Sequence, residues 1–77
     1  FEPAHGSSPK YKGKNKINPT ATILSAAWML QYLGDIKSRN EIFEATERVI
    51  SEGKSVTYDL GGNSKTSEMT SEIINYL

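Results

Sequence analysis

The side chains that could do chemistry gather in one stretch near the N-terminus, residues 5–20. Four lysines occupy alternate positions there: Lys10, Lys12, Lys14 and Lys16. The 77-residue chain as a whole is neutral, with nine basic and nine acidic residues, so this positive charge is local. A local excess of positive charge suggests an anionic ligand, and it does not imply nonspecific nucleic-acid binding by the whole surface.

Three interpretations of this lysine-rich loop stay open on the residues alone. The lysines can simply keep a solvated loop soluble, which is the commonest role of surface lysine. They can bind nucleic acid with Tyr11 stacking on a base, although such sites usually bring arginines and several aromatics, which this loop lacks. They can also hold a small phosphate ligand, because the loop leads toward a helix N-terminus, where backbone N–H groups and the helix dipole favour an anion.

The stretch HGSSP, residues 5–9, supports the phosphate interpretation. Gly6 allows close approach to the backbone, and the flat ring of His5 could stack on a base. His5 could also be a general base or a metal ligand, but it is the only histidine in a chain without cysteine, which disfavours a metal site. Asp59, in the stretch TYDLGG, could equally form a turn or bind a ligand. We find no complete catalytic constellation and expect no catalytic residue in this chain.

The elements that must position the loop are helices. Residues 1–18 carry Gly, Pro, Ser and Asn at the density of turns and form the loop. Asn18 then predicts a helix start, because its side chain can accept an unpaired backbone N–H and Pro19 suits the first helical position. The expected helices are 19–33, 38–52 and 66–77, so the fold class of this chain is mostly α.

Local signals mark the ends of these helices. Gly34 suits a left-handed cap after the first helix, and Gly53 ends the second. Ser38, with Glu41 three residues later, predicts a capping box at the start of the second helix. Thr66 is the expected cap of the third.

The first predicted helix is apolar on nearly every side. Its apolar residues are Ala21, Ile23, Leu24, Ala26, Ala27, Trp28, Met29, Leu30, Tyr32 and Leu33. A helix without a polar face needs neighbours all round, and two further short helices cannot easily supply them. The chain also starts at Phe1 in what reads as the end of a strand. We therefore expect this chain to be a segment of a longer protein.

The stretch FEPAHGSSPKYKGKNKINPTATILSAAWMLQYLG, followed by VTYDLGG, resembles the C-terminal segment of the β-decarboxylating dehydrogenases. These are the isocitrate, isopropylmalate and homoisocitrate dehydrogenases. The resemblance covers residues 1–77, and its three motifs stand in the family's order and spacing: the His-Gly-Ser loop, the Asn-Pro-Thr-Ala helix start and the Asp-Leu-Gly-Gly turn. It implies that the chain, an N-terminal loop plus three helices, is the C-terminal fragment of a single α/β dehydrogenase domain.

The resemblance implies that the anion is the dinucleotide cofactor. The positions that match the family's cofactor-binding residues are His5, Gly6, Ser7, Ser8, Pro9, Lys10, Tyr11, Asn18 and Tyr58. Among them, Lys10-Tyr11 matches the pair that contacts the 2′-phosphate in NADP-using isocitrate dehydrogenases, where NAD-using members usually carry Asp-Ile. The chemistry agrees, because a dianionic phosphate needs a cation and a hydroxyl donor, whereas an Asp would repel it.

Two features depart from the NADP pattern or fall outside it. Bacterial NADP enzymes carry an arginine four residues after the tyrosine that matches Tyr58, and this chain has Gly62 there. The family pattern gives no role to Lys12, Lys14 and Lys16, so the solvated-loop interpretation stands for these three.

The resemblance implies a parent enzyme that oxidatively decarboxylates isocitrate to 2-oxoglutarate with NADP, in the tricarboxylic acid cycle. The chemistry would be hydride transfer followed by loss of CO2, with Mg or Mn as the Lewis acid. The family's catalytic and metal-binding residues lie upstream of the matched segment, so this chain alone is expected to be inactive. The alternatives are an isopropylmalate or homoisocitrate dehydrogenase and, in a different class, a free-standing phosphate- or nucleic-acid-binding module.

The expected partners are the dinucleotide and the remainder of the parent polypeptide, and the parent is expected to be a homodimer. No stretch reads as a signal peptide or a membrane span, and the absence of cysteine fits a reducing compartment. We therefore expect a cytoplasmic protein.

Overall fold

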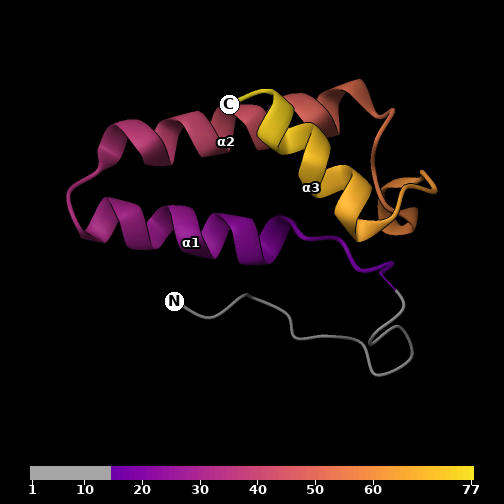
Figure 1. Ribbon diagram of the computed structural model, residues 1–77, viewed down its shortest axis with the longest axis horizontal. Helices are drawn as coiled ribbons and strands as arrows, with labels where there is room; N and C mark the ends of the chain where they lie inside the picture. Colours follow the sequence, from indigo (N-terminus) through magenta and orange to yellow (C-terminus); the bar gives the residue numbers. More distant parts are fainter. Residues whose placement is uncertain (1–14) are drawn as a thin grey trace.

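Three helices make up the part of the chain that the computed structural model describes, residues 15–77. They are α1 (Thr20–Tyr32), α2 (Ile36–Glu52) and α3 (Thr66–Asn75), and a short 3-10 turn, η1 (Tyr58–Leu60), lies between α2 and α3. α1 and α2 run antiparallel side by side, and α3 lies over the C-terminal half of α2 (Figure 1). Residues 15–77 contain no strand, so the expected helical class is confirmed for this part.

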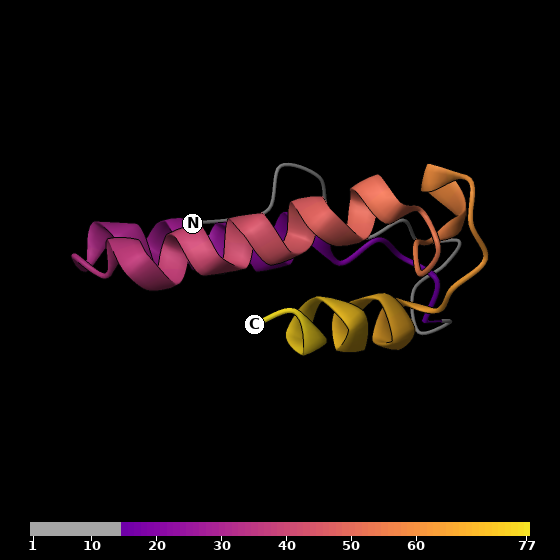
Figure 2. The ribbon, with the colours of Figure 1, turned by 90° about the horizontal axis from the view of Figure 1, so that it is seen from above.

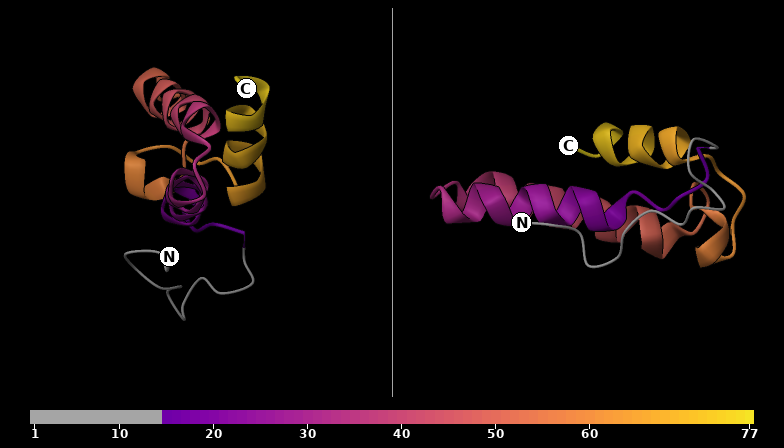
Figure 3. Two further views of the ribbon diagram at one scale, coloured as in Figure 1. Left: turned by 90° about the vertical axis from the view of Figure 1, so that its left-hand side faces the viewer. Right: turned by 90° about the horizontal axis from the view of Figure 1, so that it is seen from below.

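The other views show how the third helix completes the arrangement. Seen from above, α3 lies on one side of the α1–α2 pair (Figure 2). Seen end-on, the three helices stand at the corners of a triangle (Figure 3). The segment that leads into α1, the turn η1 and the N-terminal end of α3 gather at one end of the molecule (Figure 1). None of the helices within residues 15–77 has the length and apolar character needed to cross a membrane.

The predicted start of the first helix was wrong by one residue, because Pro19 is the N-cap and α1 begins at Thr20. The side chain of Asn18 accepts a hydrogen bond from the N–H of Thr20 (2.9 Å), and the carbonyl of Pro19 accepts the N–H of Ile23 (3.0 Å). Asn18, one residue before the cap, thereby satisfies one of the N–H groups that the first helical turn leaves unpaired.

The predicted start of the second helix was wrong. Gly34 adopts φ +95° after the end of α1, and the next residue, Asp35, is the N-cap of α2. The carboxylate of Asp35 accepts the N–H of Ser38 (3.1 Å), and α2 therefore begins at Ile36. The capping box that the sequence suggested at Ser38 and Glu41 is absent, because Ser38 already lies within the first turn.

The predicted cap of the third helix was also wrong by one residue. Lys65 is the cap, and its backbone N–H donates to the carboxylate of Glu68 (2.6 Å). Thr66 instead lies in the first turn, where its hydroxyl donates to the carbonyl of Ile17, 49 residues away in the chain. The local sequence cannot reveal this long-range contact.

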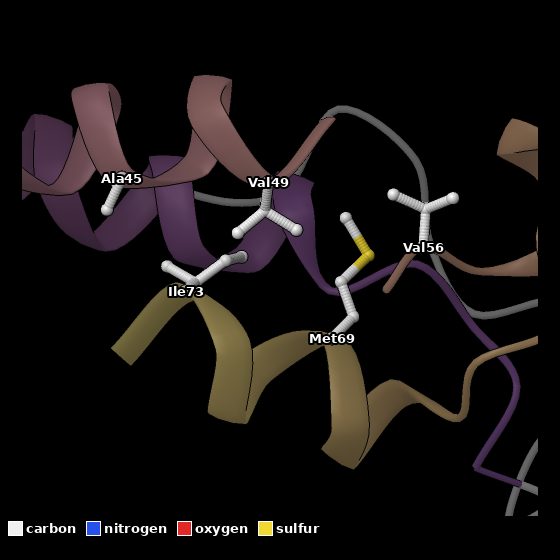
Figure 4. Close-up of a cluster of buried hydrophobic side chains, with 5 residues drawn as sticks. All are labelled: Ala45, Val49, Val56, Met69 and Ile73. Atoms are coloured by element: carbon white, nitrogen blue, oxygen red, sulfur yellow. The ribbon is translucent and has the colours of Figure 1, made fainter. Parts of the chain in front are cut away.

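The core that holds the helices together is small. It consists of Ala45, Val49, Val56, Met69 and Ile73, drawn in Figure 4. The side chains of α2 and α3 point toward one another there, with Val56 closing one end of the cluster (Figure 4). Two residues pack against the cluster from outside, Ile23 of α1 and Tyr76 after α3.

The far end of α1 keeps a large apolar surface in the open. Trp28 is 49% exposed, Tyr32 is 78% exposed and Leu33 is 70% exposed. Only Ser25 and Ala27 of this helix are buried. Residues 15–77 therefore leave uncovered most of the helix that the sequence indicated to be apolar on nearly every side.

Candidate functional site

The last residues of the lysine-rich loop are fastened to the N-terminal end of α3. The backbone carbonyl of Asn15 accepts the N–H of Thr66, and its side-chain oxygen accepts the N–H of Ser67, each at 2.9 Å. The amide of Asn15 also donates to the hydroxyl of Ser67 (2.9 Å). Because asparagine tolerates a positive φ, here +55°, the chain can turn at this point. These bonds fix the place at which the loop enters the helical part.

Asn18 joins the loop exit to the turn around η1. Its amide donates to the carboxylate of Asp59 (3.0 Å), which lies 41 residues further along the chain. The other oxygen of Asp59 accepts the hydroxyl of Thr57, whose side chain is fully buried. One carboxylate is therefore held from two sides, and the two segments that the sequence marked as candidate binding elements lie together.

Backbone hydrogen bonds close the turn itself. The carbonyl of Thr57 accepts the N–H of Leu60 (3.0 Å) and that of Gly62 (3.2 Å). Gly61 adopts φ +87°, which suits glycine because this region is strained for residues with a Cβ.

Gly62 has no room for a side chain. A Cβ at this position would lie 2.2 Å from the carbonyl oxygen of Val56 and 2.8 Å from its side chain. The same carbonyl accepts the N–H of Ser64 (3.0 Å), so it is held in place. The close approach of the two backbones therefore requires glycine here, and an arginine could not be accommodated without moving the turn.

A cavity opens beside this turn. It has a volume of about 240 Å³ and is lined by Lys16, Tyr58, Asn63, Ser64 and Lys65. The ring of Tyr58 is about half exposed, at 49%. We call this cavity the Lys16–Lys65 pocket. Two ammonium groups, a phenol, an amide and a hydroxyl can together bind an anion.

The structure describes two of the predicted cofactor-binding residues, and their binding role stays a prediction. His5, Gly6, Ser7, Ser8, Pro9, Lys10 and Tyr11 lie outside the described residues. Asn18 and Tyr58 lie at the same end of the molecule, linked through the bond from Asn18 to Asp59. Sequence reasoning missed the two pocket lysines, because Lys16 was read as solvated and no local pattern distinguishes Lys65.

Other polar clusters in residues 15–77 hold helices together and lie outside this pocket. The hydroxyl of Tyr76 donates to the carboxylate of Glu52, and Arg48 pairs with the same carboxylate (3.5 Å). The bond from Tyr76 lowers the pKa of Glu52, and the same bond raises the pKa of Tyr76. Within residues 15–77 no group of three or more His, Cys, Asp or Glu side chains could hold a metal ion.

The Lys16–Lys65 pocket lies where the loop exit meets the turn around η1. The described part of the chain is therefore a three-helix segment with a candidate anion-binding site. The family model described as isocitrate/isopropylmalate dehydrogenase matches residues 1–73. The chain therefore belongs to the isocitrate/isopropylmalate dehydrogenase family, whose members have an α/β fold of which these helices form a part.

Relatives with assigned functions fall in the same family. The chain is 51% identical over 73 residues to a 3-isopropylmalate/3-methylmalate dehydrogenase of Methanocaldococcus jannaschii, covering 95% of this chain and 22% of that protein. It is 49% identical to a regulatory subunit of the mitochondrial NAD isocitrate dehydrogenase of Dictyostelium discoideum, covering 96% and 21%. It is 48% identical to the alpha subunit of the mitochondrial NAD isocitrate dehydrogenase of Bos taurus, covering 95% and 20%. The chain thus spans about a fifth of the length of these relatives.

Proposed function

We propose that this chain is the part of an NADP-dependent isocitrate dehydrogenase that binds the adenosine end of the cofactor. The hydrogen bond from Asn18 to Asp59 (3.0 Å) is the observation that carries this proposal. It brings the helix start and the Asp-Leu-Gly-Gly turn, two motifs far apart in the sequence, to one place beside a pocket with two lysines. A dinucleotide site needs such a convergence, because separate segments must contact the base, the ribose and the phosphates.

The preference for NADP rests on Lys10-Tyr11. These residues provide a cation and a hydroxyl, which suit a 2′-phosphate, whereas a carboxylate at the first position would repel it. Two of the relatives above are named as NAD enzymes. The cofactor that we propose for this chain therefore differs from the one in those names, and the difference rests on this pair of residues.

The rest of the proposed activity belongs to a longer polypeptide. It would oxidise isocitrate to 2-oxoglutarate in the tricarboxylic acid cycle, with Mg or Mn bound by residues outside this chain. That polypeptide would also cover the exposed end of α1 and form a homodimer. We propose a cytoplasmic location because the absence of cysteine fits a reducing compartment, and the relatives named as mitochondrial favour the mitochondrion as the alternative.

A second candidate function is an isopropylmalate dehydrogenase. The name of the Methanocaldococcus jannaschii relative, a 3-isopropylmalate/3-methylmalate dehydrogenase, favours it. The two candidates share the cofactor segment and differ in the acid that they oxidise. Turnover of the full-length protein with isocitrate or with 3-isopropylmalate separates them.

The cofactor proposal is tested by exchanging Lys10 and Tyr11 for the pair usual in NAD enzymes. In the full-length protein, Lys10→Asp with Tyr11→Ile should move preference from NADP toward NAD. Losing a charge-assisted contact to a phosphate costs about 1.5–3 kcal/mol, and the new carboxylate adds repulsion. The ratio of kcat/KM for NADP to that for NAD should therefore fall by at least about a hundredfold.

A matched control removes two other lysines of the same loop, in Lys12→Ser with Lys14→Ser. This variant should change the ratio much less, because neither lysine matches a cofactor contact. An unchanged ratio in the Asp-Ile variant would overturn the proposal. An equal loss in the control would move the phosphate contact to the other lysines.

A further inference from the structure

The proposed NADP site lacks the cation that the bacterial NADP pattern would supply. That pattern has an arginine at the position of Gly62, and the residue is glycine here. The Cβ of any side chain at this position would lie 2.2 Å from the carbonyl oxygen of Val56. The turn therefore excludes an arginine on steric grounds, and a phosphate beside Tyr58 needs its second cation from elsewhere.

The Lys16–Lys65 pocket holds two cations beside the same tyrosine. Lys16 comes from the loop exit and Lys65 from the cap of α3, and both line the cavity with Tyr58. The bonds of Asn15 to Thr66 and Ser67 hold these two segments together. These bonds therefore hold together the two segments that carry the pocket lysines.

The charged side chains that line the pocket are both positive. Among residues 15–77, no carboxylate lines it, and neither lysine forms an ion pair with a carboxylate of those residues. The two nearest acids in sequence have other partners. Asp59 accepts from Asn18 and Thr57, and Glu68 accepts from the backbone N–H of Lys65.

The size of the pocket limits the ligands that it can enclose. Its volume of about 240 Å³ lies below the range of about 300–1,000 Å³ that drug-sized ligands occupy. A whole dinucleotide is therefore too large for it. A phosphate is small enough, and the hydroxyl of Ser64 and the amide of Asn63 add polar groups that can donate to its oxygens.

We propose that Lys16 and Lys65 bind the 2′-phosphate of NADP in this pocket and replace the arginine that Gly62 excludes. The inference rests on the proposed NADP function and names the residues that would set its specificity. A phosphate monoester carries about −1.5 to −2 charges at pH 7, so both ammonium groups attract it and add to the contact proposed for Lys10. Lys16 thereby gains a binding role that the loop sequence alone did not reveal.

The experiment compares three variants of the full-length protein with the wild type. Lys16→Met with Lys65→Met removes both charges and keeps the side-chain length. Lys16→Arg with Lys65→Arg keeps the charges and serves as the rescue. Lys37→Met with Lys54→Met is the matched control, because both lysines are exposed and neither lines the pocket. Steady-state kinetics give kcat/KM for NADP and for NAD, and a thermal melt checks that each variant is folded.

The double Met variant should lower the ratio of kcat/KM for NADP to that for NAD by at least about tenfold, which is the loss expected for one charge-assisted contact. The Arg variant should keep most of the preference, and the control should keep all of it. A wild type that prefers NADP with an unchanged ratio in the Met variant would overturn the pocket assignment alone. A wild type that prefers NAD would overturn the cofactor proposal and this inference together.

Discussion

At the scale of single residues, the site depends on side chains that serve two purposes at once. Asn18 accepts the N–H of Thr20 at the start of α1 with its side-chain oxygen, and it donates to Asp59 with its amide. Gly62 is required by a backbone contact with Val56, and the same contact excludes any larger side chain, arginine included. The sequence predicted a helix start at Asn18, within one residue of the observed cap at Pro19, because helix starts have local signals. It could not predict the bond to Asp59, which depends on the tertiary fold.

The steric argument at Gly62 makes a direct prediction. Gly62→Ala and Gly62→Arg should destabilise the protein to a similar extent, by about 1–3 kcal/mol, because the conflict begins at the Cβ that both share. Thermal or urea denaturation of the full-length protein measures this loss. Lys54→Ala, at an exposed position, is the control. A stable Gly62→Arg variant with a stronger preference for NADP would contradict our account of the turn.

At the scale of elements, the sequence predicted the three helices to within a few residues and misplaced all three of their N-caps. The bounds 19–33, 38–52 and 66–77 correspond to α1, α2 and α3. The errors have physical causes. Asp35 and Ser38 are both good capping residues. The turn at Gly34 is followed directly by Asp35, which is the residue that caps α2. The hydroxyl of Thr66 bonds to Ile17 across the fold, a contact that no local pattern contains.

The cap at Asp35 predicts how the start of α2 responds to substitution and to pH. The hydrogen bond from the N–H of Ser38 lowers the pKa of Asp35, so the folded state favours the carboxylate. This contribution is present above the unfolded pKa of Asp, about 3.9, and is lost as the pH falls through the lower folded value. Asp35→Ala should therefore speed amide exchange at Ser38 at neutral pH, and its difference from wild type should shrink in acid.

Asp35→Asn separates the cap from its charge. Asparagine also accepts the N–H of Ser38 but does not titrate, so exchange at Ser38 should stay near the wild-type rate and should lose this pH dependence. Amide hydrogen exchange followed by mass spectrometry over residues 36–40 measures both effects. Wild-type rates in Asp35→Ala at neutral pH would show that another group caps α2.

At the scale of the whole molecule, the described part of the chain has a core of five residues and an apolar helix that is largely uncovered. Trp28, Tyr32 and Leu33 leave exposed a surface that a helix normally buries against neighbours. The sequence predicted this from the composition of the helix. The pocket could not be predicted, because Lys16 and Lys65 are 49 positions apart in the sequence. Only the tertiary contact between the loop exit and the start of α3 brings them to one pocket.

The central claim is that this chain binds the adenosine end of NADP in an isocitrate dehydrogenase. The most direct test is the ratio of kcat/KM for NADP to kcat/KM for NAD, measured on the full-length protein with isocitrate and Mg. We predict a ratio well above one, because Lys10-Tyr11 and the Lys16–Lys65 pocket each favour a 2′-phosphate. A ratio below one, or no turnover of isocitrate with either cofactor, would contradict the account.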